Sequence, residues 1–119
     1  MMTPLVALQD GEPRLVIGTG GSTRIRSATL QVLSNLIDFR MSLSASVNHP
    51  RIHYEDGVLQ CEGGIDPAAV DRLESDGYRV NRWDRSSIYF GGAHAVMRSP
   101  LGRLAGAGDP RRGGAVEFT

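Results

Sequence analysis

Residues 14–25 read RLVIGTGGSTRI, which is an apolar run, a glycine-rich loop and the start of a helical pattern. The apolar run 15–17 is preceded by a second one at 5–8, and the turn-forming residues 9–12 between them predict a hairpin. Beyond the loop, apolar residues at spacings of three and four predict a helix to residue 37 that is buried on much of its circumference. Ser22 or Thr23 is expected to cap the start of this helix.

The rest of the chain predicts further short elements in sequence order. A short helix is expected at 41–47, and strands at 51–54 and 58–62. Asp66 and Pro67 together form a strong helix start, and Gly77 is the expected C-terminal glycine of that helix. Strands follow from residue 78, at 88–97 with an interruption at Gly91 and Gly92, and at 103–107. This order, with two main helices among mostly hairpin-linked strands, predicts an α+β fold with a largely antiparallel sheet.

Length and composition exclude several classes of function. With 119 residues, we expect one domain spanning 1–119. The 13 acidic residues balance 13 basic ones, which argues against a nucleic-acid or membrane partner. All the basic residues are arginine, so lysine-dependent phosphate loops, Schiff bases and pyridoxal phosphate are excluded, and no cofactor is expected. No apolar run is long enough for a membrane span, and the N-terminus lacks a charged region followed by an apolar one. We therefore expect a soluble protein, cytoplasmic as the chain stands, with its location otherwise open.

The glycine-rich loop has three possible interpretations. It could be a dinucleotide fingerprint, since Gly18 and Gly20 fit, but the third position is Thr23, and the candidate ribose ligand Asp38 lies in a helical pattern. It could be an oxyanion hole, in which the N–H groups of Gly20 and Gly21 approach a developing negative charge. It could also be a tight turn that needs glycine only for its backbone conformation.

Other chemistry-bearing residues give weaker signals. His49 and His53 could share one side of a strand, but no third ligand has suitable spacing, so no metal site is expected. His94 is expected to be a core or edge residue, and Cys61 an inert buried thiol. The C-terminal arginines are expected to form a solvated or salt-bridged face: Arg98, Arg103, Arg111 and Arg112.

Five segments together resemble the γ-glutamyltransferase (γ-glutamyltranspeptidase) family. They occur in the family's order over nearly the whole chain, at residues 2–6 (MTPLV), 18–25 (GTGGSTRI), 30–39 (LQVLSNLIDF), 45–53 (ASVNHPRIH) and 106–115 (GAGDPRRGGA). The resemblance implies an N-terminal-nucleophile hydrolase, an αββα sandwich of which this chain would be a part. Its implied activity is attack by an N-terminal threonine on the γ-glutamyl amide of glutathione-type substrates, with transfer to water, amino acids or peptides.

The resemblance also implies which residues serve that reaction. Gly20 and Gly21 match the paired glycines that stabilise the oxyanion. Many members have Pro-Gly-Gly-Ser-Arg here, and an alignment anchored on Arg24 places the pair at Gly21 and Ser22 instead. The nucleophilic threonine belongs to an upstream segment, and Thr3 cannot replace it because the base must be that residue's own α-amino group. We therefore expect no catalytic residue and no complete active site in this chain.

Two hypotheses of different classes remain. In the first, the chain is the C-terminal portion of the small subunit of such an enzyme, inactive alone, and its partner is the upstream catalytic segment or the large subunit. An exposed apolar surface would then cause the isolated chain to bind that partner or self-associate. In the second, the chain is a non-catalytic module that oligomerises or binds a small anionic ligand at the glycine loop.

Overall fold

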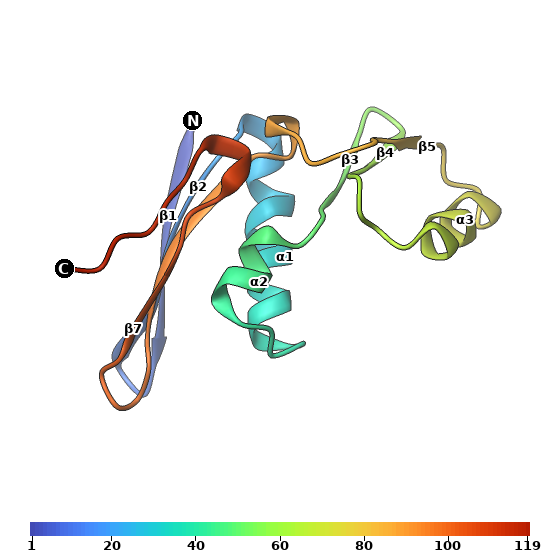
Figure 1. Ribbon diagram of the computed structural model, residues 1–119. Coiled ribbons are helices and arrows are strands. Elements are labelled where there is room, and N and C mark those ends of the chain that lie inside the picture. The colour runs from blue at the N-terminus through green and yellow to red at the C-terminus, as the bar shows by residue number, and fades with distance from the viewer.

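The computed structural model describes residues 1–119 and measures 46 × 26 × 21 Å (Figure 1). Its larger part is a four-stranded antiparallel sheet in the order β1-β2-β6-β7. Helices α1 (Ile25–Ile37) and α2 (Leu43–Asn48) both lie on the same side of this sheet (Figure 1). The strands are β1 (Met2–Gln9), β2 (Glu12–Gly20), β6 (Gly92–Arg98) and β7 (Leu104–Ala107). The expected α+β class is confirmed.

The hairpin predicted at the N-terminus is formed by β1 and β2. Asp10 and Gly11 make its turn with φ angles of 53° and 78°, which aspartate tolerates and glycine favours. Val6 pairs with Val16 and Leu5 pairs with Ile17 across the hairpin. Since side chains alternate along a strand, one of these pairs faces the helices and the other faces away from them.

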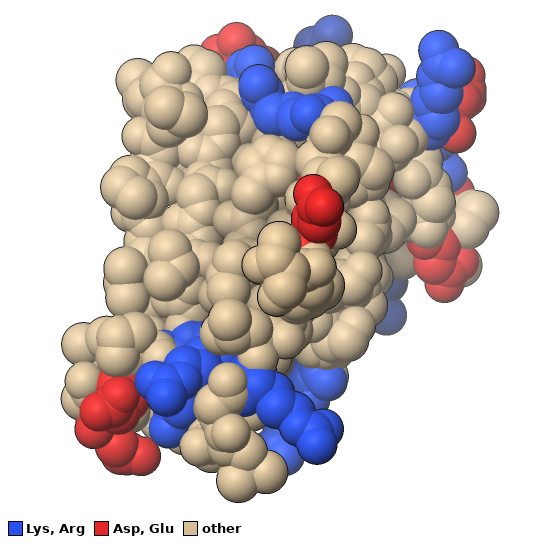
Figure 2. All heavy atoms as spheres, turned by 60° about the vertical axis from the view of Figure 1, so that its left-hand side comes forward, with Lys and Arg blue, Asp and Glu red and all other residues tan.

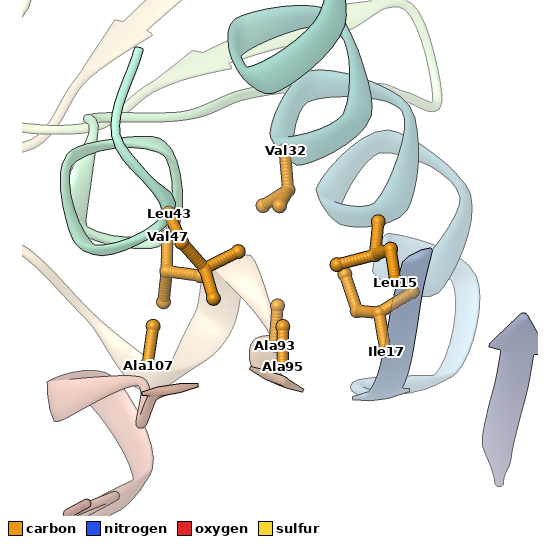
Figure 3. Packing of buried hydrophobic residues seen from close by; sticks show 8 residues of the cluster. All are labelled: Leu15, Ile17, Val32, Leu43, Val47, Ala93, Ala95 and Ala107. Carbon is orange, nitrogen blue, oxygen red and sulfur yellow. The ribbon is translucent and has the colours of Figure 1, made fainter. Parts of the chain in front are cut away.

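The hydrophobic core lies between the sheet and the two helices. Small residues of β6 and β7 let the helices approach closely, while β2 contributes larger side chains (Figure 3). The core cluster contains Leu15, Ile17, Val32, Leu43, Val47, Ala93, Ala95 and Ala107. Neither α1 nor α2 covers the other face of the sheet. The C-terminal segment lies over its β7 edge, where Val116 packs on Gly106.

Helix α1 differs from the expectation at both its start and its surface. The loop first makes a 3₁₀ turn, Ser22–Arg24, and neither Ser22 nor Thr23 gives a side-chain cap, so that prediction was wrong. The helix is also less buried than its pattern suggested, with Leu30 68% and Ile37 62% exposed. Periodicity identifies the apolar stripe, but it does not say what covers that stripe.

A smaller unit of three strands and one helix lies beside the main sheet (Figure 1). It consists of β3 (Ile52–Glu55), β4 (Val58–Cys61), α3 (Pro67–Ser75) and β5 (Val80–Arg82). Asp66 caps α3 as predicted, by accepting the Ala68 N–H at 3.1 Å. Strand β5 pairs in parallel with β4, because α3 forms the crossover between them.

The predicted strand 88–97 begins later than expected. Ile88–Phe90 forms a 3₁₀ turn, and Gly91 has a φ of 76° before β6 starts at Gly92. This turn brings Phe90 and Gly91 next to the buried side chain of Arg51, which donates to both carbonyls at 3.3 Å. None of the helices has the length and hydropathy required to cross a bilayer.

A buried ion-pair network joins segments that are far apart in the sequence. Arg51 donates to Asp109 at 2.8 Å, and Arg111 contacts Glu62 at 2.6 Å and Asp109 at 3.2 Å. Asp109 also accepts the Ala93 N–H at 2.8 Å. The network therefore ties β6, the smaller unit and the C-terminal segment together.

Candidate functional site

The glycine-rich loop forms one wall of a cavity of about 690 Å³ at the end of the four-stranded sheet. The cavity is lined by the start of β1, by the end of β2 with the loop that follows it, and by the start of β6. Thirteen residues line the cavity: Met1, Met2, Thr3, Pro4, Gly18, Thr19, Gly20, Gly21, Ser22, Arg24, Gly92, His94 and Arg112. The three candidate oxyanion residues predicted from sequence thus all lie on one cavity.

Packing explains why one of the loop residues is a glycine. Gly21 has a φ of 140°, and a Cβ there would lie 2.7 Å from the Gly91 Cα atom, so no larger residue fits. Gly20 has more room, since its nearest neighbours would lie 3.9 Å from a Cβ. Ser22 has a φ of 57°, a conformation uncommon outside glycine. The tight-turn interpretation therefore accounts for Gly21, but not for Gly20.

Side chains that follow the loop hold it against the smaller unit, and we call Thr23, Arg24, Glu55 and Tyr89 the loop clamp. Thr23 donates to Glu55 at 2.6 Å, and Arg24 lies 3.6 Å from the same carboxylate. Arg24 also donates to the Tyr89 carbonyl at 3.1 Å, and its guanidinium lies 4.8 Å from the centre of the Tyr89 ring. The hydrogen bond from Thr23 lowers the pKa of Glu55, so the carboxylate that anchors the clamp is ionised at neutral pH.

A buried histidine lies behind the clamp. His53 is 5% exposed, and its Nδ1 atom is 2.7 Å from the Ser27 hydroxyl, while its Nε2 atom is 3.7 Å from Glu55. Burial lowers the pKa of His53, which favours the neutral ring. This Ser-His-Glu arrangement lies apart from the cavity, because neither Ser27 nor His53 lines it.

The hydroxyls on the cavity have no base beside them. His94 lines the cavity, but its Nδ1 atom accepts the Asp109 N–H at 3.2 Å, which places the proton of the neutral ring on Nε2. The Thr19 hydroxyl is bonded to Thr29 at 2.9 Å, on the helix side of the sheet. No hydrogen bond joins His94 to Thr3 or Ser22. The cavity is thus lined by the backbone of the glycine loop and by two arginines, without an activated nucleophile.

The matching proteins point to one family. The gamma-glutamyltranspeptidase family model matches residues 1–119. The chain belongs to the gamma-glutamyltranspeptidase family. It is 40% identical over 106 residues to the acylase ACY 1 proenzyme of Pseudomonas sp. strain SE83, a match that covers 89% of this chain and 18% of that protein.

Two further relatives give the same result. The glutathione hydrolase proenzyme of Escherichia coli is 33% identical over 112 residues, covering 92% of this chain and 19% of that protein. The gamma-glutamyltranspeptidase of Pseudomonas nitroreducens, solved with L-DON, superposes with a TM-score of 0.83 at 28% identity, over 99% of this chain and 61% of that chain. The chain therefore spans about a fifth of the length of these curated relatives.

As a gamma-glutamyltranspeptidase fold, the structure is the helix-and-sheet part of an N-terminal-nucleophile hydrolase sandwich. We call the face of the sheet turned away from α1 and α2 the outer face. The C-terminal segment covers it at the β7 edge, where Val116 packs on Gly106. Figure 2 shows the outer face as a broad uncharged area, with charged side chains at its two ends and one acidic side chain near its middle. Val6, Val16 and Val96 on this face are 55%, 50% and 50% exposed.

Several other sequence expectations are also decided by the structure. The dinucleotide interpretation was wrong: the loop follows an antiparallel hairpin, and Asp38 lies at the exposed end of α1. His49 is exposed at the end of α2, apart from buried His53. Cys61 is buried as expected, and burial raises the pKa of its thiol.

Sequence reasoning treated the C-terminal arginines as one group, but the structure separates them. Arg111 is buried in the ion-pair network, whereas Arg112 lies on the cavity. Arg98 lies 3.9 Å from Glu12, in an exposed pair. The order of charged residues could not distinguish these roles. Those of Arg111 and Arg112 depend on the fold of the tail, and that of Arg98 depends on the pairing of β2 with β6.

Proposed function

We propose that this chain is the C-terminal portion of a γ-glutamyltransferase-like enzyme and supplies its oxyanion loop. The reaction is transfer of the γ-glutamyl group from glutathione-type amides to water, amino acids or peptides. The observation that carries the proposal is the position of the glycine loop, on a cavity at the end of a sheet whose outer face is half-exposed at Val6, Val16 and Val96. Membership of the gamma-glutamyltranspeptidase family gives the reaction class.

The loop contributes electrostatic stabilisation of the tetrahedral intermediate. Attack on an amide carbonyl places negative charge on its oxygen, and two backbone N–H groups from the loop would bind that oxygen. Gly21 belongs to both alternative pairs, either with Gly20 or with Ser22. Loss of one such donor typically slows an enzyme by about 10²–10³. The loop clamp and the close contact of Gly21 with Gly91 support this role, because they fix the backbone before substrate arrives.

The nucleophile comes from a different segment in this proposal. The family's N-terminal threonine carries its own base, the α-amino group, and the cavity hydroxyls described here have no base beside them. An upstream segment that packs on the outer face would enclose the cavity and bring the threonine to the loop. The chain alone is therefore inactive.

Release of nitroaniline from γ-glutamyl-4-nitroanilide tests the proposal. The chain is assayed alone and then mixed with a separately expressed upstream segment of a family member that bears the threonine. The matched control is the same mixture with that threonine changed to alanine. We expect turnover only in the mixture that contains the threonine.

Two results would overturn the proposal. Turnover by the chain alone would contradict the claim that this chain contains no catalytic nucleophile. Absence of turnover in a mixture that is shown to form a complex would rule out the catalytic role of the chain. The hypothesis of a non-catalytic module that oligomerises or binds a ligand would then be favoured.

A further inference from the structure

The two oxygen atoms of the Glu55 carboxylate have different surroundings. Oε1 accepts a short hydrogen bond from the Thr23 hydroxyl, at 2.6 Å. Oε2 lies between three donors and close to none of them. They are the Tyr89 hydroxyl at 3.4 Å, the Arg24 guanidinium at 3.6 Å and the His53 Nε2 atom at 3.7 Å. One oxygen therefore holds the loop clamp, while the other can be drawn toward any of three partners.

The neutral His53 ring cannot satisfy every polar group around it. Its Nδ1 atom lies 2.7 Å from the Ser27 hydroxyl, which in turn donates to the Arg24 carbonyl at 3.3 Å. A serine hydroxyl has one proton, so Ser27 can donate either to the ring or to the carbonyl. With the ring proton on Nδ1, Nε2 presents a lone pair to the Glu55 carboxylate. With the ring proton on Nε2, the Arg24 carbonyl loses the Ser27 donor.

A protonated His53 ring satisfies both ends of this chain of contacts. Its Nδ1–H donates to Ser27, Ser27 donates to the Arg24 carbonyl, and its Nε2–H faces Glu55. The Nε2 atom is buried and has no hydrogen-bond partner in the structure. A charged pair of this kind bonds at about 2.7–2.9 Å, so the present distance of 3.7 Å has to shorten. The ring is 5% exposed and the carboxylate 29%, so the carboxylate is the group that moves.

Burial lowers the pKa of His53, and charges on neighbouring elements modify that shift. Glu55, on the same strand, favours the protonated ring, whereas Arg24 in the 3₁₀ turn and Arg26 in α1 disfavour it. Tyr89 meets the ring edge-on, with 6.3 Å between the ring centres. The ring is therefore neutral at neutral pH and takes up a proton only below its ordinary pKa.

We infer that His53 and Glu55 are positioning residues that make the glycine loop respond to protonation. A proton taken up from solvent by His53 draws the Glu55 carboxylate toward Nε2. The hydrogen bond from Thr23 passes this movement to the 3₁₀ turn, which directly follows Gly21. The inference deepens the proposed function by naming a regulation of its oxyanion loop, and it rests on that function only for the effect on turnover.

A pH titration of the isolated chain by NMR, from pH 7.5 to 5, tests the coupling without any reaction. The chain has three histidines, His49, His53 and His94, and the ring resonances of each give its own midpoint. We expect the amide resonances of Gly21 and Ser22 to shift with the midpoint of His53. They should not follow the midpoint of His94, which lines the cavity.

Substitutions separate the histidine that takes up the proton from the carboxylate that transmits the movement. His53→Gln should abolish the transition at the loop. Glu55→Gln should leave His53 titrating but remove most of the loop shift, whereas a direct effect of the ring charge on the loop would persist. Thr23→Val keeps both charges and removes only the hydroxyl that joins Glu55 to the loop, so it should give the same loss.

The matched control is His49→Gln, which removes an exposed histidine at the end of α2 and should leave the transition in place. Two results would overturn the inference. In one, the loop resonances of the wild type do not follow the His53 midpoint. In the other, they follow it equally in Glu55→Gln and Thr23→Val.

Turnover of γ-glutamyl-4-nitroanilide by the chain assembled with the upstream segment measures the consequence. A displaced loop weakens an interaction made in the transition state, so it should lower kcat and leave KM nearly unchanged. Over the pH range in which His53 takes up its proton, kcat of the wild type should fall about tenfold more than that of His53→Gln. Outright loss of a donor would cost about 10²–10³. The amino group of the threonine titrates in both proteins, so the difference between them reports on His53.

The two proposals fail in different ways. Parallel kcat profiles of wild type and His53→Gln would overturn the inference. An assembled enzyme without turnover at any pH would count against the proposed function alone, because the NMR titration needs no reaction and still decides whether His53 moves the loop.

Discussion

The two faces of the four-stranded sheet are built from the same strands but have opposite surroundings. Along β2, Leu15 and Ile17 are 3% and 1% exposed beneath the helices, while Val16 between them is 50% exposed. At the end of β2, Thr19 faces the helices and its hydroxyl is hydrogen-bonded to that of Thr29 in α1. The next residue, Gly20, is on the outer face and lines the cavity. Exposed apolar surface of this kind is typical of interaction surfaces, which supports the proposal that the upstream segment packs here.

The two faces have different roles. The inner face holds the chain together through its core and the adjacent ion-pair network. We expect the outer face to contribute less to the stability of the chain, and it is the surface on which we propose that the upstream segment packs, beside the cavity. Five experiments test this division.

The largest expected effect is on the network beside the inner face. Asp109→Ala leaves the guanidinium groups of Arg51 and Arg111 buried without their shared partner, so it should cost about 3–5 kcal/mol of unfolding free energy. Urea denaturation measures the loss. The control, Asp71→Ala, breaks an exposed pair with Arg82 and should cost less than about 1 kcal/mol. Similar losses for the two variants would refute the structural role of the network.

A charge on the outer face should block association and spare the fold. Val96→Glu should weaken binding to the upstream segment by about a hundredfold or more, because an unpaired carboxylate would be buried in the interface. The unfolding free energy of the chain should change by less than about 1 kcal/mol, the span of strand preferences. Fluorescence anisotropy with labelled segment measures the affinity, and Val96→Thr is the uncharged control. Unchanged affinity would show that the outer face is not part of the interface with the upstream segment.

The same truncation on each side gives a direct measure of the difference in burial. Val47→Ala removes methyl groups from the inner core and should cost about 2 kcal/mol. Val16→Ala on the outer face should cost about 0.5 kcal/mol or less. Equal costs by chemical denaturation would mean that the outer face is covered in the isolated chain, as self-association would do.

The smallest effect is a pH dependence on the helix side. Burial lowers the pKa of His53, so the unfolded chain binds this proton more tightly than the folded one. The stabilisation is complete above about pH 6.5, the ordinary histidine value, and is lost as the pH falls toward the lowered folded-state value. His53→Gln should flatten the dependence of unfolding free energy on pH between 7.5 and 5, and Tyr54→Phe should leave it intact. An unaltered slope in His53→Gln would assign the dependence to other groups.

Local signals in the sequence predicted the elements well, because each depends on neighbouring residues. The hairpin around Asp10 and Gly11 and the Asp66 cap are examples. The network could not be predicted this way, since Arg51 and Asp109 are 58 positions apart and meet only in the folded chain. Sequence found the candidate glycines, but it could not place Arg112 on the same cavity, because its contact with Gly92 depends on how the tail folds back on β6.

NMR of valine methyl groups in the labelled chain, with and without the upstream segment, tests the division of the two faces most directly. The account predicts that the methyl resonances of Val6, Val16 and Val96 shift on addition of the segment, while those of Val32 and Val47 in the core stay in place. Complex formation without any change at Val6, Val16 and Val96, or with changes confined to Val32 and Val47, would contradict it.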